Sequence, residues 1–503
     1  MRTRMSVLVV VVCIAVLMLT IGLPVSATVP GHGGAPVAKR SPMTSDVTAH
    51  YVGTRLASGQ PSPYCNIGTP SQPVIIMCYT PQDIRTAYNY PSYLNGRGQT
   101  IVIIDAFGDP TVQSDLNMFD AEYGLPATTI QIVCQGGTCP VYDPTNADMV
   151  SWALEITLDT QVAHAMAPGA HIILYVAQLD DDLTMVQAAA SAIAMFPHSI
   201  ISQSWGDAEL DMLQGTCNPY GPCSPSYVQD VLSTGERAYR QAAQEGTTVF
   251  AAAGDWGADN SVVCPGCTSA NPIYPSSSPW VTGVGGTEGY PYYFGSIPNC
   301  GTNRTCSTGL VNFLNSPACQ LSNQTPPSSA TCQPIGYGGE QVWNDANTWP
   351  YSTTGGAPSL IFGTPFYQRG LGLPSRATPD VSYFAAGSGG PLLYWSTPPT
   401  APGFYIFYGT SSGSPQWAAV AALADQLAVL LHRGTLGFIN PELYAIGNNP
   451  YLYRFAFHDI TVGNNTDPDG LNVGFSATPG WDDASGWGTP NVANLVLALA
   501  LMS

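Results

Sequence analysis

Short, β-branched apolar segments alternate with longer segments of helical character between residues 99 and 255. Short continuous apolar segments are typical of buried strands, whereas the longer segments repeat their apolar residues at helical spacing. Strands that alternate with helices usually pair in parallel, because a parallel connection must return along the length of the sheet. We therefore predict an α/β fold: a doubly wound, mostly parallel sheet with helices on both faces. The predicted strands are 99–107, 128–134, 170–177, 199–205 and 247–255, and the predicted helices between them are 109–124, 146–167, 183–196 and 227–246.

The alternation fades between residues 257 and 360, where Gly, Ser, Pro, Asn and Cys dominate. We expect long loops there, pinned by disulfides around a few strands. Of the thirteen cysteines, twelve lie beyond Cys13, and they form close neighbours along the chain, which favours local disulfides. The alternative for "CPGC" at 264–267 is half of a zinc site. The predicted disulfides are Cys65–Cys78, Cys134–Cys139, Cys217–Cys223, Cys264–Cys267, Cys300–Cys306 and Cys319–Cys332.

The N-terminus has the pattern of a secretion signal. Arg2 and Arg4 precede an apolar run at 7–23, and small residues lead to a cleavage point after Ala27. An uncleaved membrane anchor is the alternative, since the run is nearly long enough to span a bilayer. We predict a signal peptide at 1–27, a short pro-segment or linker at 28–77, and a secreted protein that makes no membrane contact after cleavage.

The charge balance argues against nucleic acid as a partner. Only 9% of the residues are charged, and 33 acidic side chains outnumber 14 basic ones, which gives a formal net charge of −19. Binding to nucleic acid needs clustered Lys and Arg. Few basic side chains also mean few ion pairs that acid could break, so the composition suits an acidic environment. We expect a monomer.

Ser411 lies in "GTSSGSP", residues 409–415, directly before a predicted helix at 416–431. A hydroxyl residue at the start of a helix is usually an N-cap. The alternative is a nucleophile held at the positive end of the helix dipole. The segment alone leaves both interpretations open.

Three carboxyl residues are candidates for a chemical role. Glu155 and Asp159 are four positions apart in the predicted helix 146–167, so they share one helix face among mostly apolar neighbours. Two neighbouring carboxyls repel, and at least one should keep its proton well above the usual pH. Asp255 follows the strand at 247–255, at the carboxyl end where ligands commonly bind. Structural alternatives are an exposed acidic helix face for the pair and a turn for Asp255.

Together these segments resemble the sedolisins, or serine-carboxyl peptidases, which have a subtilisin-like fold and act in acid. The resemblance implies that Ser411 is the nucleophile, Glu155 its general base, Asp159 the partner that orients Glu155, and Asp255 the oxyanion donor. It also implies that residues 78–503 form a peptidase domain that acts on proteins or peptides. The matching segments are "EITLD" followed by "VAHAMAPGA", "AAAGDWG", "RATPDVS" and "GTSSGSP".

The resemblance further implies one structural calcium ion near the C-terminus. Its ligands would be oxygens of side chains and backbone, as calcium prefers. The family usually has glycine at the position of Thr478. The implied ligands are the side chains of Asp459 and Asp482 and the carbonyl groups of Ile460, Thr478 and Gly480.

Two other functions remain open on the sequence. The first is a subtilisin-type peptidase with a Ser-His-Asp triad, for which His164 lies on the same helix as Glu155. The second is a catalytically inactive secreted binding or surface protein on the same scaffold.

Overall fold

The computed structural model describes residues 48–53, 64–66, 75–215, 223–264, 266–294, 334–345, 352–387, 389–467 and 472–503. Contacts between Cα atoms divide the chain into residues 1–35 and 36–503, and every described residue belongs to the second unit. The predicted signal peptide therefore lies outside the described residues. Among the described helices, none is long and apolar enough to cross a membrane.

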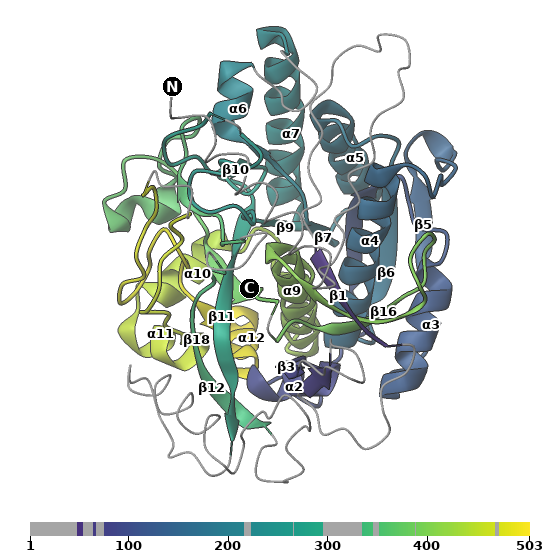
Figure 1. Ribbon diagram of the computed structural model, residues 1–503. Coiled ribbons are helices and arrows are strands. Elements are labelled where there is room, and N and C mark those ends of the chain that lie inside the picture. The colour runs from purple at the N-terminus through teal and green to yellow at the C-terminus, as the bar shows by residue number, and fades with distance from the viewer. Residues whose placement is uncertain are drawn as a thin grey trace, which may run out of the picture. The chain divides into compact units, whose positions relative to one another are not determined.

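An eight-stranded, mostly parallel sheet forms the centre of this unit (Figure 1). All strand pairs are parallel except β11 with β12. This confirms the predicted α/β architecture. In sheet order the strands are β12 (Pro334–Val342), β11 (Thr282–Phe294), β9 (Thr248–Ala252), β7 (Ile200–Gln203), β4 (Thr100–Ala106), β6 (His171–Ala177) and β5 (Gln131–Cys134), and β15 (Val381–Phe384) pairs with β11.

Helices cover both faces of the sheet, because successive residues of a strand point to opposite sides. In β4, Ile101 and Ile103 belong to a buried cluster that includes residues of α4 and α9. Val102 and Ile104 belong to a second cluster with α5 and α7. The main helices are α3 (Val112–Tyr123), α4 (Ala147–Met166), α5 (Asp182–Met195), α7 (Pro225–Glu245), α9 (Gly413–Leu430) and α12 (Val492–Met502).

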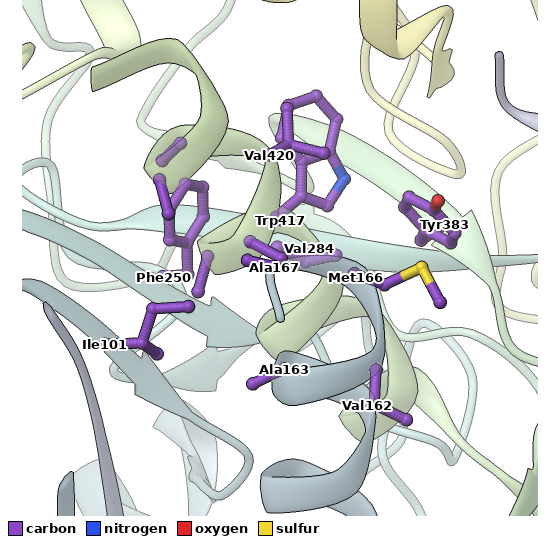
Figure 2. Close-up of a cluster of buried hydrophobic side chains, with 14 of the residues drawn as sticks. Ile101, Val162, Ala163, Met166, Ala167, Phe250, Val284, Tyr383, Trp417 and Val420 are labelled. Carbon is purple, nitrogen blue, oxygen red and sulfur yellow. The ribbon is translucent and has the colours of Figure 1, made fainter. Parts of the chain in front are cut away.

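The helix α9 is deeply buried within the first cluster. Its residues from Gly413 to Asp425 are all buried. Figure 2 shows Trp417 of this helix near Phe250 of β9, and the two rings stack with centroids 6.3 Å apart. Each large apolar side chain buried in this way contributes about 1.5–3 kcal/mol relative to its exposed state. This packing holds the start of α9, which directly follows the turn that contains Ser411.

Shorter elements connect and extend this framework. The remaining helices are α2 (Pro81–Ala87), α6 (Glu209–Gln214), α10 (Asn440–Gly447) and α11 (Pro450–Ala456), with 3-10 turns η1 (Gln135–Gly137), η3 (Phe366–Leu371) and η4 (Thr410–Ser412). The remaining strands are β1 (Thr48–Gly53), β2 (Tyr64–Asn66), β3 (Ile75–Met77), β8 (Asp207–Ala208), β10 (Ile273–Tyr274), β13 (Ala357–Pro358), β14 (Ala377–Thr378), β16 (Leu392–Trp395), β17 (Gly403–Tyr408), β18 (Phe457–His458) and β19 (Thr489–Pro490).

Two segments have more regular structure than the sequence predicts. The segment 28–77 was expected to be a linker or pro-segment without a strong pattern, yet β1 from this segment pairs antiparallel with β17. The region 257–360 was expected to be mainly loops, yet β11 is a strand of thirteen residues in the main sheet. In both cases the pairing comes from a distant partner, which a local pattern does not reveal.

The described disulfides agree with the local scheme. Cys134 is bonded to Cys139, and Cys264 to Cys267. The second bond excludes the alternative of half a zinc site at "CPGC". Cys78 and Cys223 are also disulfide-bonded. The predicted pairs Cys300–Cys306 and Cys319–Cys332 lie outside the described residues.

Candidate active site

Helix α4 runs through the interior of the molecule and contains Glu155 and Asp159. The helix begins at Asn146, whose side chain accepts hydrogen bonds from the backbone of residues 148 and 149. All residues from Trp152 to Met166 are buried, and both carboxyl residues have an exposed fraction of 0%. The alternative of an exposed acidic face is therefore wrong. An ionised carboxylate is costly in such a place, because water is replaced by a medium of low polarity.

The Glu155 carboxyl is held strongly toward its neutral form. Burial raises the pKa of Glu155 well above its usual value, and nearby Asp159 and Asp105 raise it further. The Ser411 hydroxyl is close enough to oppose this shift. Neither carboxyl oxygen of Glu155 has a hydrogen-bond partner among the described residues, so Ser411 and Glu155 are adjacent rather than fully hydrogen-bonded.

Ser204 connects Asp159 to the backbone of Ser411. The Ser204 hydroxyl lies 2.9 and 2.8 Å from the two carboxyl oxygens of Asp159, and 3.3 Å from the Ser411 carbonyl oxygen. Burial raises the pKa of Asp159 well above its usual value, the charge of Asp105 adds to the rise, and Ser204 opposes it. Ser204 comes directly after β7, and sequence reasoning did not single it out.

A third buried carboxyl, Asp105, completes this group. It lies near the carboxyl end of β4, and its exposed fraction is 0%. Neither of its carboxyl oxygens has a hydrogen-bond partner among the described residues, and burial raises its pKa to about 8. Sequence reasoning missed Asp105. The available signal was one acidic residue inside the apolar run "TIVIIDAF", near the end of a predicted parallel strand.

Ser411 lies in the short turn η4 between β17 and α9 and is 4% exposed. No serine side chain caps α9, so the N-cap interpretation of this segment is wrong. Gly409 enters the turn with φ at +130°, and a Cβ atom at this position would collide with the Asp255 carboxyl. A glycine is therefore required to bring the backbone of the serine turn against Asp255.

Asp255 follows β9 and is held by the residue that precedes Ser411. The backbone N–H and the side-chain hydroxyl of Thr410 donate to the same Asp255 carboxyl oxygen, at 2.7 and 2.6 Å. Thr410 in turn accepts from the Gly254 N–H at 3.1 Å. Asp255 and Ser411 together line a hollow at the surface. Asp255 is therefore part of the site rather than a simple turn residue.

His164, which a Ser-His-Asp triad would require, faces a different part of the molecule. Its ring Nε2 lies 3.2 Å from a carboxyl oxygen of Asp120 in α3 and 3.0 Å from the carbonyl oxygen of Pro126. The site around Ser411 contains Glu155 instead. The structure therefore contradicts the subtilisin-type triad with His164.

Asp459 and Asp482 meet at one loop near the C-terminus. The backbone N–H of Gly480 donates to Asp459 at 3.1 Å, and that of Thr478 donates to Asp482 at 2.7 Å. The carbonyl oxygens of Ile460, Thr478 and Gly480 accept no hydrogen bond from the described residues. Two carboxylates with three open carbonyls fit a calcium ion, which binds oxygen alone. No described group of three or more His, Cys, Asp or Glu side chains is arranged for a metal, and this loop offers only two.

Comparison with known proteins decides the family. Residues 146–431, which include Glu155, Asp159, Asp255 and Ser411, match the model of the subtilase family. The chain belongs to this family. Kumamolisin of Bacillus sp. (strain MN-32) is 30% identical over 441 residues, which cover 85% of this chain and 65% of that protein. Tripeptidyl-peptidase 1 of Homo sapiens is 27% identical over 443 residues, which cover 84% of this chain and 64% of that protein.

The solved structures confirm the subtilase fold. Pseudomonas sedolisin, a serine-carboxyl proteinase, superposes with a TM-score of 0.62 at 24% identity, covering 84% of this chain and 98% of that one. Sedolisin of Pseudomonas sp. (strain 101) is 26% identical over 428 residues, which cover 83% of this chain and 60% of that protein. This chain spans a little under two thirds of the length of the curated relatives named above.

Proposed function

We propose that this chain is a secreted, acid-active serine-carboxyl endopeptidase. The observation that carries the proposal is the placement of Ser411 between the buried carboxyls of Glu155 and Asp159 and the carboxyl of Asp255. A buried hydroxyl with such neighbours has a base for its proton and a donor for the oxygen of a reacting carbonyl group.

In the proposed reaction, the Glu155–Asp159 pair holds a single proton, and while this proton lies on Asp159 the carboxylate of Glu155 is ionised. The Ser411 oxygen then attacks the carbonyl carbon of the peptide bond while Glu155 takes the hydroxyl proton. The carbonyl oxygen becomes negative and accepts a hydrogen bond from protonated Asp255. The C–N bond then breaks, Glu155 returns the proton to the leaving amine, and an acyl ester remains on Ser411. Water attacks this ester in the same way and releases the acid product and free Ser411.

The proposed roles require acid. A carboxylic acid can donate a hydrogen bond only while it is protonated, so Asp255 serves the oxyanion only in that state. Asp159 shares a proton with Glu155 and keeps it oriented, and the bond from Ser204 holds Asp159 in place. Raised pKa values at Glu155 and Asp159 support a proton-sharing pair at low pH.

A structural calcium ion is part of the proposal. Asp459 and Asp482 would hold it together with the carbonyl oxygens of Ile460, Thr478 and Gly480. The ion would link the loop at 478–482 to the chain after β18, far from Ser411 in sequence. It would stabilise the fold and take no part in the bond cleavage.

The remaining expectations extend the proposal. Residues 1–27 are a signal peptide, residues 28–77 a short pro-segment or linker, and residues 78–503 the peptidase domain. The substrates are proteins or peptides. We expect a secreted monomer that binds neither nucleic acid nor, after cleavage of the signal, a membrane.

A denatured protein substrate tests the proposal directly. Digestion at pH 3–5 that disappears at pH 7.5, and that is absent from the Ser411→Ala variant, would support it. Full activity at pH 7.5 would contradict the acid mechanism. Absence of digestion at every pH would favour the alternative of an inactive secreted binding protein on this scaffold.

A further inference from the structure

A small hollow lies beside Ser411, between two segments that follow adjacent strands of the sheet. The segment 204–206 after β7 forms one wall, and the segment 252–255 at the end of β9 forms the other. Ile273 of β10 closes the space between them. The hollow measures about 10 Å³, which is about the room for one water molecule. The enclosed part of the hollow therefore matches a small side chain.

Ile273 is the residue that fills this space. A Cβ atom built on Gly206 would lie 2.8 Å from the Ile273 Cδ1 atom, and one built on Gly254 would lie 3.2 Å from the same atom. The tip of Ile273 is thus packed against both walls. Its backbone is fixed there because Ile273 pairs with Ala208 in the ladder between β10 and β8. Ile273 is 6% exposed and lines the hollow.

Asn260 supplies a polar atom to the same hollow. Its side chain is fully buried, and its amide nitrogen donates to the carbonyl oxygen of Asn271. Its Oδ1 atom has no hydrogen-bond partner among the described residues. This oxygen lies 3.2 Å from where a Cβ atom of Gly254 would be, in the wall of the hollow. A buried acceptor without a donor is unfavourable, so a hydroxyl group that reaches it would be stabilised.

The position of the hollow shows which substrate residue it would receive. Its lining includes Ser411 and Asp255, which act on the carbonyl group in the proposed reaction. The lining, as far as the described residues go, does not include Glu155, which must return its proton to the leaving amine. The hollow therefore lies on the acyl side, beside the residue that contributes the carbonyl group.

We propose that Ile273 restricts this pocket to a small side chain at the acyl residue of the scissile bond, and that Asn260 favours serine among small side chains. The inference rests on the proposed peptidase function and adds its substrate class: peptide bonds that follow alanine or serine. Without the Ile273 side chain, the space between Gly206 and Gly254 would be larger and would accept larger side chains of the substrate.

Matched peptides that differ only in the acyl residue test the proposal at pH 4. The residues are alanine, serine, 2-aminobutyrate, leucine and phenylalanine, and kcat/KM is measured for each. Wild type should cleave after alanine and serine faster than after leucine and phenylalanine. Serine should exceed 2-aminobutyrate, which has the same number of heavy atoms but no hydroxyl. Ile273→Ala should raise the phenylalanine-to-alanine ratio by about 100-fold, since one methylene group already changes such ratios by about 10–200-fold.

The control is Ile193→Ala, which makes the same truncation in the buried part of α5, away from the pocket. It should keep the wild-type ratio. If Ile273→Ala does not fold, Ile273→Val should shift the ratio in the same direction by a smaller factor. A wild type that prefers phenylalanine or leucine, or an Ile273 variant with an unchanged ratio, would overturn this inference while leaving the peptidase function intact. Failure to cleave any peptide or a denatured protein would overturn the function itself.

Discussion

Two groups of buried carboxyls in this protein have opposite surroundings. Asp380 is paired with Arg376 at 2.7 and 2.5 Å, and both side chains are fully buried. Asp380 also accepts from the Gly283 N–H and the Tyr444 hydroxyl. The second group, Asp105, Glu155 and Asp159, is equally buried, but no ion pair with a cation reaches it within the described residues.

The presence or absence of a neighbouring cation distinguishes a buried carboxyl with a structural role from one with a chemical role. Burial lowers the pKa of Arg376, but the charge of Asp380 more than reverses this and raises it above its usual value, so the guanidinium group remains charged. Without a cation, burial instead raises the pKa of Asp105, Glu155 and Asp159, so the group as a whole retains protons that its members can share. Carboxyl groups that retain protons beside Ser411 can transfer protons during a reaction. The Arg376–Asp380 ion pair, in contrast, only stabilises the fold.

The largest effect should come from Ser411, the proposed nucleophile, which lies beside the group without a cation. Ser411→Ala should lower kcat at pH 4 by about 10⁶-fold, as expected when a nucleophilic serine is removed. Circular dichroism should show a folded protein. Ser412→Ala makes the same change one residue later and should keep most of the activity. Comparable kcat values in the two variants would contradict the assignment of Ser411.

The Arg376–Asp380 pair should show the opposite behaviour, with a loss of stability rather than of chemistry. Arg376→Ala leaves Asp380 buried without its cation, which should lower the free energy of unfolding by about 3–5 kcal/mol. Urea denaturation at pH 4 measures this. The exposed Arg237→Ala variant should change the free energy by less than about 0.5 kcal/mol. Equal stability of the two variants would show that the buried pair does not hold the fold.

Asp255 should affect the transition state more than substrate binding. Asp255→Ala should lower kcat by about 10²–10³-fold at pH 4 with little change in KM, because the lost hydrogen bond acts on charge that develops during the reaction. Asp255→Asn keeps a side-chain N–H donor and should recover part of the activity. A large rise in KM with normal kcat would instead assign Asp255 to binding.

Two further carboxyls, Asp459 and Asp482, extend the comparison, because in the proposal a calcium ion neutralises them in place of an arginine. Removing calcium with EDTA should lower the free energy of unfolding by about 2.7 kcal/mol when the free ion had been at one hundred times its Kd. Differential scanning calorimetry with and without EDTA measures the effect. Asp459→Asn should abolish the response to EDTA. An unchanged melting temperature of the wild type would contradict the calcium site.

The last prediction concerns the pH dependence of stability. The pKa of Asp105 is raised from 3.8 to about 8 in the fold, so the folded protein binds the proton more tightly than the unfolded chain. Its contribution is complete below about pH 4 and is lost as the pH rises toward about 8, at no more than about 1.4 kcal/mol per pH unit. Asp105→Asn should flatten the fall of the unfolding free energy across this range, and the exposed Asp230→Asn should not. Equal slopes would contradict the buried, protonated state of Asp105.

The alternation of strands and helices was predictable because each element carries its own pattern. The strand at 99–107 and the helix at 146–167 were expected within a few residues of β4 and α4. The strand β11 was missed, since "TGVGGTEGYPYYF" contains four glycines and a proline and has little local preference for a strand. Its partners β9, β12 and β15 supply the hydrogen bonds, and they lie up to about a hundred residues away in sequence.

The sequence by itself determined the order of the strands and helices between residues 99 and 255 and the family to which the chain belongs, because these depend on local patterns and short motifs. It also predicted the four residues of the proposed catalytic group. Only the tertiary structure decided that α4 is buried on every side, that Asp105 joins Glu155 and Asp159, and that Ile273 fills the hollow beside Ser411. Burial and the meeting of distant side chains depend on how the helices pack against the sheet, and no short stretch of sequence contains that information.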